Sequence, residues 1–337
     1  MAEKPLAPLG GPLQLVLPFR SDEELATAEF PYEEIVECGV LGSGTRLLMG
    51  GDAKIGKSYV ALQAAWDLAT ASPFLGTLQV MRPNRVLVLQ FELAERLWQR
   101  RYLRCRDFYG KTDNIRTLST KHFRLDREDG SDFDKLYHDI KEWEADVVIF
   151  DPLYYMHNAN ENEAQEMTPL LRLLDRIADE LGCAVMLVHH KRKPTLDYRG
   201  RRVATGISEF RGSSVLHAWP DTLMEVAANR AGLTVNFELR NYDGVLPPIE
   251  MEWQSNGPPL APVERLRAMS PALLRKAIEL LREANGAMRA AEMKRQLERH
   301  SSPAIARRVI DALLAQGTFS EADDPDDKRH KLIRFKQ

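Results

Sequence analysis

The stretch "GGDAKIGKSYV", residues 50–60, decides the fold. Gly51, Gly56, Lys57 and Ser58 fit the pattern G-x-x-x-x-G-K-[ST], and they stand between the apolar run "RLLMG" and the amphipathic segment "GKSYVALQAAWDLATA". A strand before the glycines and a helix after them is the context in which this pattern marks a phosphate-binding loop. The sequence therefore predicts a nucleoside triphosphate site at a strand-to-helix turn. A glycine-rich turn with an incidental Lys-Ser pair is the alternative.

Each residue type in this loop suits a chain of phosphates. Glycines let backbone N–H groups turn inward around phosphate oxygens at the amino terminus of a helix. Lys57 brings positive charge to the β and γ phosphates, and Ser58 offers its hydroxyl to Mg²⁺. We therefore expect ATP and Mg²⁺ as cofactors. The predicted nucleotide-binding residues are Gly51, Asp52, Ala53, Lys54, Ile55, Gly56, Lys57, Ser58 and Tyr59.

Two acidic residues follow apolar strands further along the chain. Asp151 ends "DVVIFD", where it is placed to hold Mg²⁺ through water or Ser58, although a strand-end cap has the same pattern. Glu92 follows "RVLVLQF", where a carboxylate can polarise the attacking water as a general base. Glu92 can instead complement the dipole of the next helix. Glu95 is the second candidate base, but its place inside that helix favours a solvated residue.

Apolar runs alternate with amphipathic segments from about Glu33 to Trp253. Near-continuous apolar strands separated by helices predict a parallel sheet covered on both faces, an α/β fold. After Asp221 three alternating runs joined by short polar turns, "TLMEVAA", "LTVNFEL" and "PIEMEW", predict antiparallel strands that finish the sheet. The arginines of the helical segment "LAERLWQRRYLRCRDF" are interpreted as a solvated face.

The carboxy-terminal part follows a Pro- and Gly-rich break, "QSNGPPLAPVE", residues 254–264. Three helical segments and two strands around an acidic turn predict a small winged helix-turn-helix domain. In its third helix, "SSPAIARRVIDALLAQG", a buried stripe is expected. The stripe comprises Ala306, Val309, Ile310, Leu313 and Leu314.

Length and composition limit the classes of protein to which this chain can belong. Among 337 residues no apolar run is long enough to span a bilayer, and the start lacks a secretory leader pattern, which predicts a soluble, cytoplasmic protein with no membrane partner. The three cysteines are far apart, so reduced thiols are expected rather than a disulfide framework or a zinc site. The net charge is −3, but it is +4 from Ser270 onward and −7 before it. This asymmetry permits nucleic-acid binding without establishing it.

Taken together, these motifs resemble the RecA-like ATPases and, among them, the RepA-type hexameric replicative helicases of plasmids. The resemblance covers about residues 25–253 and rests on "GGDAKIGKS", Glu92 at a strand end, "VVIFDPLYYMHNANENEA", "GCAVMLVHHKRK" and "RGSSVLHAW". It implies a RecA-like P-loop core, ATP hydrolysis, assembly into a homo-hexamer and passage of single-stranded DNA through the ring pore. A winged helix is not required by that family's core, so it is a departure.

The resemblance also implies roles for single residues. His190, in preference to His189, corresponds to a sensor that couples the γ-phosphate to the DNA-binding loops, although a histidine satisfied by neighbouring backbone is the alternative. Arg211 in "FRGSSVL" is the expected arginine finger, donated to the neighbouring subunit's ATP, and Arg240 is the runner-up. Arg211 can also be a DNA-loop residue or part of a buried ion pair.

Two basic groups are candidates for DNA contact. The first is in "KRKPTLDYRGRRVATGISEF", which the resemblance places at the pore, and the simpler alternative is a solvated loop. Its residues are Lys191, Arg192, Lys193, Arg199, Arg201 and Arg202. The second belongs to the predicted winged helix, which binds duplex or fork DNA or instead a replication protein, because the acidic turn "EADDPDD" repels phosphate. Its residues are Arg307, Arg308, Lys328 and Arg329.

The expected organisation is an amino-terminal arm or linker (1–24), a RecA-like ATPase domain (25–253), a linker (254–267) and a winged-helix domain (268–337). The expected function is that of an ATP-hydrolysing, ring-forming motor that translocates on single-stranded DNA and unwinds duplex in the replication of a plasmid, phage or other mobile element. One alternative is an ATP-gated DNA-binding regulator or loader without strand separation. Another is a RecA-like clock or signalling ATPase that binds no DNA.

Overall fold

The structure is a computed structural model, and it describes fifteen stretches of the chain. They are residues 19–30, 32–127, 129–190, 214–230, 232–242, 244, 246–255, 258–263, 271–299, 306–307, 309–310, 313–314, 318–324, 327 and 331–335. The chain divides into two compact units, residues 1–32 and 33–337. In the first unit, helix α1 (Asp22–Thr27) begins with a capping box in which Ser21 and Glu24 each bond the other's backbone N–H.

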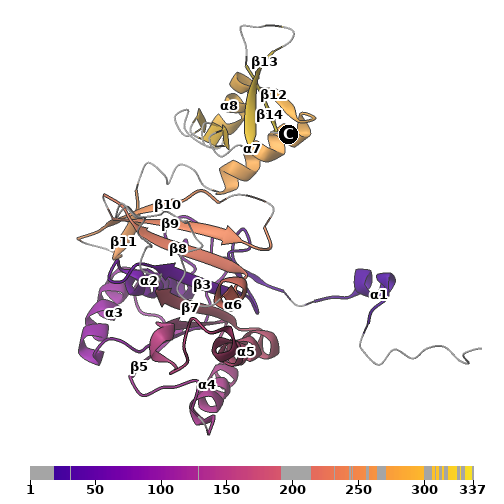
Figure 1. The fold of residues 1–337 in the computed structure, drawn as a ribbon. Coiled ribbons are helices and arrows are strands. Elements are labelled where there is room, and N and C mark those ends of the chain that lie inside the picture. Colours follow the sequence, from indigo (N-terminus) through magenta and orange to yellow (C-terminus); the bar gives the residue numbers. More distant parts are fainter. Residues whose placement is uncertain are drawn as a thin grey trace, which may run out of the picture. The chain divides into compact units, whose positions relative to one another are not determined.

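A nine-stranded sheet forms the centre of the described part of the second unit (Figure 1). Its strands are β3 (Arg46–Gly51), β4 (Val86–Gln90), β5 (Ile115–Ser119), β6 (Val147–Asp151), β7 (Ala184–His190), β8 (Thr222–Ala228), β9 (Gly232–Leu239), β10 (Ile249–Trp253) and β11 (Leu260–Pro262). The order is β11-β10-β9-β8-β3-β7-β6-β4-β5. From β8 to β5 neighbouring strands are parallel, whereas β9, β10 and β11 pair antiparallel. The predicted α/β fold with a mostly parallel sheet and an antiparallel finish is confirmed.

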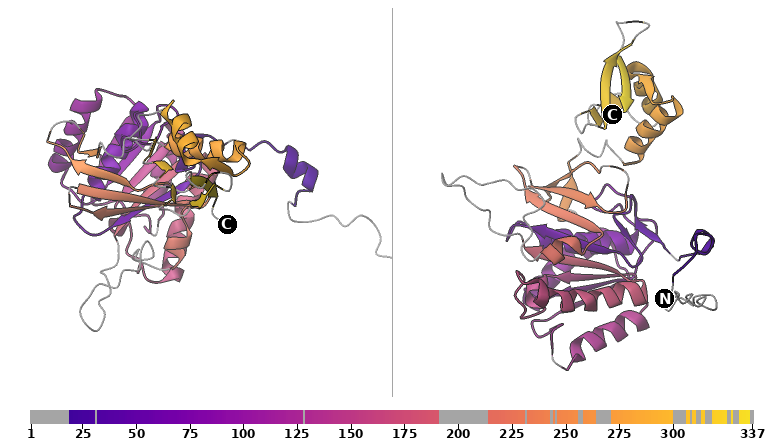
Figure 2. Two further views of the ribbon diagram at one scale, coloured as in Figure 1. Left: turned by 90° about the horizontal axis from the view of Figure 1, so that it is seen from above. Right: turned by 45° about the vertical axis from the view of Figure 1, so that its right-hand side comes forward.

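Helices cover both faces of this sheet (Figures 1 and 2). Successive strand residues point to opposite faces, so Leu47 and Met49 of β3 join one core cluster and Leu48 joins the other. The first cluster includes α2 (Lys57–Thr70) and α3 (Glu95–Tyr109). The second includes α4 (Ser131–Glu142), the short η1 (Leu153–Tyr155), α5 (Ala164–Leu181) and α6 (Ser214–Ala218). Burial on both sides explains the continuous apolar strands of the sequence.

Strand β11 lies inside the stretch 254–267 that the sequence predicts to be a linker. It pairs with β10, and the side chain of Gln63 in α2 bonds both backbone groups of Leu260, accepting from its N–H at 3.0 Å and donating to its carbonyl at 2.9 Å. Gln63 therefore acts as a substitute strand partner. The prolines of this segment are tolerated because it lies at the edge of the sheet.

Other short strands also lack an apolar pattern in the sequence. The edge strand β5 has only Ile115 buried, which is why "IRTLS" gives no strand signal. Strands β1 (Glu34–Val36) and β2 (Leu41–Gly42) form a separate two-stranded sheet. None of the helices in the described part of the chain combines the length and the apolar character that crossing a bilayer requires.

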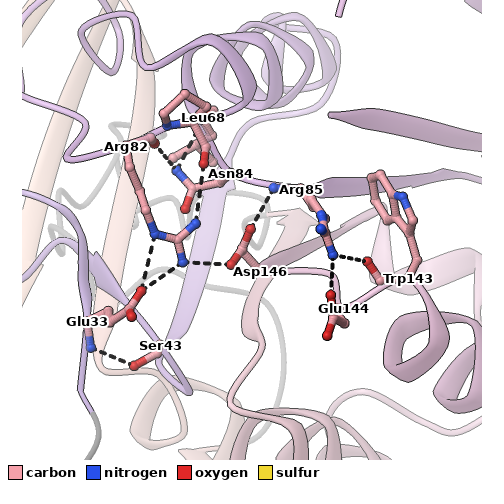
Figure 3. A network of polar contacts seen from close by, with 10 residues as sticks. Glu33, Ser43, Leu68, Arg82, Asn84, Arg85, Trp143, Glu144 and Asp146 are labelled. Atoms are coloured by element: carbon pink, nitrogen blue, oxygen red, sulfur yellow. Dashed lines mark hydrogen bonds and ion pairs between the residues drawn. The ribbon is translucent and has the colours of Figure 1, made fainter. Parts of the chain in front are cut away.

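A network of charges joins the amino-terminal ends of β4 and β6 (Figure 3). Arg82 donates to Glu33 and to Asp146, in each case at 2.8 Å. The other oxygen of Asp146 accepts from the backbone N–H of Arg85 at 2.7 Å, and the Arg85 guanidinium donates to Glu144 at 2.6 Å. Because Arg85 precedes β4 and Asp146 precedes β6, these bonds fix the start of two neighbouring strands.

The carboxy-terminal part has its own core. The predicted stripe is present, since Ala306, Val309, Ile310 and Leu313 are buried and Leu314 packs against them. A three-stranded antiparallel sheet accompanies the helices, with the strand at 287–289 at one edge, the strand at 331–335 in the middle and the strand at 319–323 at the other edge. The strand at 287–289 is absent from the sequence prediction. The winged-helix assignment stays a prediction. The elements are α7 (Pro271–Glu283), β12 (Ala287–Arg289), α8 (Ala290–Glu298), β13 (Phe319–Asp323) and β14 (Lys331–Phe335).

Candidate active site

The glycine-rich turn joins the central strand β3 to α2, and packing dictates its glycines. A Cβ on Gly51 would lie 2.3 Å from the carbonyl oxygen of Val226 in β8, so no side chain fits there. Gly56 is the N-cap of α2 and has a φ of +113°, which other residues rarely adopt. Among the described side chains none caps the first turn of α2. The turn therefore presents bare backbone at a helix amino terminus, which is where phosphates bind.

Lys57 is the first residue of α2 and is only 5% exposed. Its ammonium group donates to the carbonyls of Gly51 at 2.9 Å and Asp52 at 2.7 Å, and lies 3.1 Å from Nδ1 of His190. Burial lowers the pKa of Lys57 to about 8, while the negative charge of Asp151 and other nearby carboxylates opposes this shift. A desolvated cation held on the turn is suited to binding a polyphosphate.

Asp151 ends β6 and is only 2% exposed. Neither carboxylate oxygen meets hydrogen-bond geometry with a described residue, as a capping role would require, although the Ser58 hydroxyl lies close enough to lower the pKa of Asp151. Burial raises the pKa of Asp151 to about 6, the charge of Glu92 acts in the same direction, and the nearby Ser58, Lys57 and Arg101 oppose it. Buried carboxylates without partners are costly, and Mg²⁺ prefers oxygen ligands of this kind. Asp151 and Ser58 therefore fit a magnesium site.

A cavity of about 340 Å³ brings these groups together at the carboxyl edge of the parallel strands. Lys57, Ser58, Glu92, Asp151 and His190 all line it. Ligands of open α/β sheets bind at this edge, and the volume is in the range of small-molecule sites. Of the other predicted loop residues, Ala53, Lys54, Gly56 and Tyr59 line the cavity as well.

The structure separates Glu92 from Glu95. Glu92 follows β4 by two residues and lines the cavity, whereas α3 starts only at Glu95, after its N-cap Ala94. Glu95 is thus the acid in the first turn of the helix, and it lines a different cavity with Trp98 and Ser119. Of the two carboxylates, Glu92 is the one placed beside Lys57 and Asp151.

The two histidines at the end of β7 have different surroundings. His190 is half-buried and lines the cavity. His189 is 1% exposed, with Nδ1 3.7 Å from a carboxylate oxygen of Glu161, and Nε2 of the buried His157 lies 3.8 Å from the same oxygen. Burial lowers the pKa of His157. The acidic turn around Glu161 therefore packs on His189, and of the two histidines His190 is the one that lines the cavity.

Several predicted residues fall elsewhere. Arg240 contacts Asp221 at 3.8 Å and donates to the carbonyl of Ala218, at the amino-terminal end of β8 and so at the opposite edge of the sheet from the glycine-rich turn. Arg307 is exposed on the carboxy-terminal part. The finger candidate Arg211 lies outside the described residues. So do the DNA-contact candidates Lys191, Arg192, Lys193, Arg199, Arg201, Arg202, Arg308, Lys328 and Arg329.

Arg101 is a cavity residue that the sequence interpretation assigned to a solvated face. Its guanidinium lies 4.2 Å above the ring of Tyr59, and its charge lowers the pKa of Asp151. Helical spacing carries a signal for it, since Arg101 comes three residues after the buried Trp98 and four before the buried Cys105. Arg101 is thus at the edge of the inward stripe of α3.

Comparison with known proteins identifies the family of this chain. A KaiC-like protein from the hyperthermophilic archaeon Pyrococcus horikoshii OT3 is 16% identical, with a TM-score of 0.45 over 68% of this chain and 93% of that chain. A second solved structure, described as an ATPase domain, is 14% identical, with a TM-score of 0.47 over 66% and 86%. Curated protein sequences give no match. The family model AAA_25, described as an AAA domain, matches residues 14–195. The chain belongs to this family and is a RecA-like P-loop ATPase.

Proposed function

We propose that this chain is a ring-forming DNA motor that hydrolyses ATP, translocates on single-stranded DNA and unwinds duplex during replication of a plasmid, phage or other mobile element. The observation that carries the proposal is the meeting of Lys57, Ser58, Glu92, Asp151 and His190 in one cavity. Family membership accounts for the ATPase part. The DNA part rests on the basic residues that follow His190 directly in the sequence.

Each charged or polar residue of the cavity has a separate role in hydrolysis. Lys57 neutralises the β and γ phosphates, where negative charge grows in the transition state. Glu92 polarises the attacking water, and its exposed position lets water reach it. Ser58 and Asp151 would hold Mg²⁺, which when bound stabilises the phosphate charge. Arg101, which acts electrostatically on Asp151, adds positive charge on the α3 side of the cavity.

Coupling to DNA is supported by the position of His190. It is the last residue of β7, it lies 3.1 Å from the Lys57 ammonium, and the next three residues of the chain are Lys191, Arg192 and Lys193. A bound γ-phosphate attracts the Lys57 ammonium and so competes with His190 for contact with this ammonium. The strand end therefore responds to the nucleotide state, and the basic segment attached to it responds in turn.

The arginine finger completes the site from a neighbouring subunit in this proposal. Arg211 is the proposed finger and Arg240 the second candidate. The contacts of Arg240 with Asp221 and Ala218 hold it far along the sheet from the glycine-rich turn of its own chain, so it can serve only across an interface. Mixing Arg211→Ala subunits with Lys57→Ala subunits should restore some turnover in a homo-hexamer. Complete absence of complementation would contradict the role of Arg211.

The experiment that tests the proposal is steady-state ATP hydrolysis with and without a single-stranded oligonucleotide at several salt concentrations. Stimulation that weakens with salt is expected, because phosphate contacts release counterions. The Lys57→Ala variant is the control for contaminating ATPases. A rate that DNA leaves unchanged would refute the motor and leave an ATPase of another kind. Strand displacement from a forked substrate then tests unwinding.

A second candidate is an ATP-gated DNA-binding regulator or loader. It is favoured by the carboxy-terminal part, which packs around its own core and presents Arg307 on its surface. If this part is a winged helix, Arg307 and Arg308 face duplex DNA from the recognition helix, with Lys328 and Arg329 on the wing. Duplex binding that changes with the nucleotide, together with no strand displacement, would support this candidate over the motor.

A further inference from the structure

An exposed tryptophan lies on the glycine-rich turn. Trp253 ends β10 and keeps 44% of its surface exposed, although large aromatic side chains are usually well covered. A Cβ placed on Gly56 would meet its six-membered ring at 2.7 and 2.8 Å, so the indole edge rests on the backbone at that glycine. An aromatic surface is thus held open to solvent beside the candidate phosphate site.

Tyr59 and Arg101 continue this surface. The Tyr59 ring stands edge-on to Trp253, with ring centroids 5.5 Å apart and an interplanar angle of 84°. Arg101 covers the Tyr59 ring from α3. Tyr59 and Arg101 line the cavity that holds Lys57. Three planar groups from α2, α3 and β10 therefore gather beside the turn.

Contacts within the fold fix this cluster in place. Arg104 of α3 donates to the carbonyl of Gln254, the residue directly after Trp253. On the other side β9 approaches so closely that a Cβ on Gly232 would lie 2.3 Å from the carbonyl oxygen of Met251. The end of β10 is therefore held from both sides, and little ordering of the protein is needed when a ligand binds.

We propose that the exposed ring of Trp253, with the perpendicular ring of Tyr59 beside it, is a stacking platform for the nucleobase of the bound nucleotide. The inference rests on the proposed ATP site and deepens it. The candidate nucleotide site has a buried, charged end at Lys57 and Asp151 and an exposed, aromatic end at Trp253. A nucleoside triphosphate has the same order of chemistry, with charged phosphates at one end and a flat aromatic base at the other.

Stacking has a consequence for specificity. Every base has a π-face, so a platform of this kind discriminates by stacking area rather than by hydrogen bonding. Purines have the larger face. The platform therefore favours ATP and GTP over CTP and separates ATP from GTP only weakly.

Binding of nucleotide and of base-free polyphosphate to the full chain tests the platform. The probes are the magnesium complexes of ATP, CTP and tripolyphosphate, measured by titration calorimetry. Trp253→Leu keeps an apolar side chain over Gly56 without a π-face, and Trp253→Phe keeps a π-face. Phe108→Leu, which changes an exposed aromatic residue of α3, is the matched control.

We expect Trp253→Leu to weaken ATP binding about tenfold. Tripolyphosphate binding should stay within about twofold of wild type, which also reports that the turn is folded. Trp253→Phe and Phe108→Leu should bind ATP nearly as wild type does, and the preference for ATP over CTP should disappear in Trp253→Leu.

Two outcomes would overturn the platform. Equal weakening of ATP and tripolyphosphate would mean that Trp253 only supports the turn at Gly56. Unchanged ATP binding in Trp253→Leu would mean that the base lies elsewhere. Failure of the proposed motor is a separate result, because ATP binding that depends on Trp253 without any stimulation by DNA removes the motor and keeps the platform.

Discussion

The two ends of the parallel strands treat charge in opposite ways. At the amino-terminal end Arg82, Arg85 and Asp146 meet their partners at 2.6–2.8 Å (Figure 3). At the carboxyl end neither oxygen of the buried Asp151 meets hydrogen-bond geometry with a described residue, and Lys57 donates to backbone carbonyls. Charged side chains are fully paired at the amino-terminal end of the sheet, where their role is to fix the first residues of β4 and β6. The edge with incomplete pairing is the one suited to a charged ligand.

The largest expected effect is at Lys57. Lys57→Ala should abolish measurable ATP turnover, because the positive charge that binds the phosphates and stabilises the charge developing on them is lost. The free energy of unfolding should also fall, because two backbone carbonyls lose their donor and the buried Asp151 loses a cation that opposes the rise of its pKa. Turnover and urea unfolding of the same preparation measure both. Retained turnover would refute the site.

Glu92→Gln should lower turnover by roughly 10²–10⁴-fold, while ATP still binds. The amide keeps the size of the side chain but cannot accept the proton of water. Glu95→Gln is the matched control, because Glu95 lies only three residues away and lines another cavity. A loss of turnover in Glu95→Gln with normal activity in Glu92→Gln would reverse the assignment.

Asp146→Ala tests the other end of the sheet. It removes the acceptor of Arg82 and of the Arg85 backbone N–H, so we expect a loss of about 1–3 kcal/mol in the free energy of unfolding. Turnover at saturating ATP should be unchanged. Glu144→Ala, whose side chain is largely exposed, should cost less than about 1 kcal/mol. A turnover defect in folded Asp146→Ala would weaken the division of roles between the two ends.

Signals that lie within one stretch of sequence predicted the fold and the core of the site. Lys57 and Ser58 sit in a strand–turn–helix pattern, and Asp151 and His190 end strands that are apolar throughout, so their meeting at one edge follows from a parallel sheet. The carboxy-terminal stripe followed from helical periodicity in the same way.

What the sequence did not predict depends on segments far apart in the chain. Gln63 makes a strand partner for Leu260, and Gly56 meets Trp253, each pair nearly 200 residues apart. A pattern within one short stretch of sequence cannot predict such a contact. Arg101 differs, because helical spacing places it on the same side of α3 as Trp98. The many other arginines of this helix favour a solvated face, and they hide that signal.

The smallest expected effect concerns another buried carboxylate, Asp67 of α2. Tyr109 and the backbone N–H of Leu75 donate to its two oxygens, at 2.7 and 2.9 Å. These bonds lower its pKa, but burial dominates and raises the pKa of Asp67 to about 8, from an ordinary value of 3.8. Asp67 therefore differs from Asp146, whose charge is paired, and it is protonated at neutral pH.

This protonation fixes the sign of a pH dependence. Between the two pKa values the folded chain binds one proton more than the unfolded chain, so the free energy of unfolding falls as pH rises, until the folded group ionises near pH 8. From pH 6 to pH 7 the loss is about 1 kcal/mol. Asp67→Asn keeps a polar group of the same size and removes this loss. Urea unfolding of both proteins at the two pH values measures the difference, and equal slopes would mean that Asp67 is ionised as exposed carboxylates are.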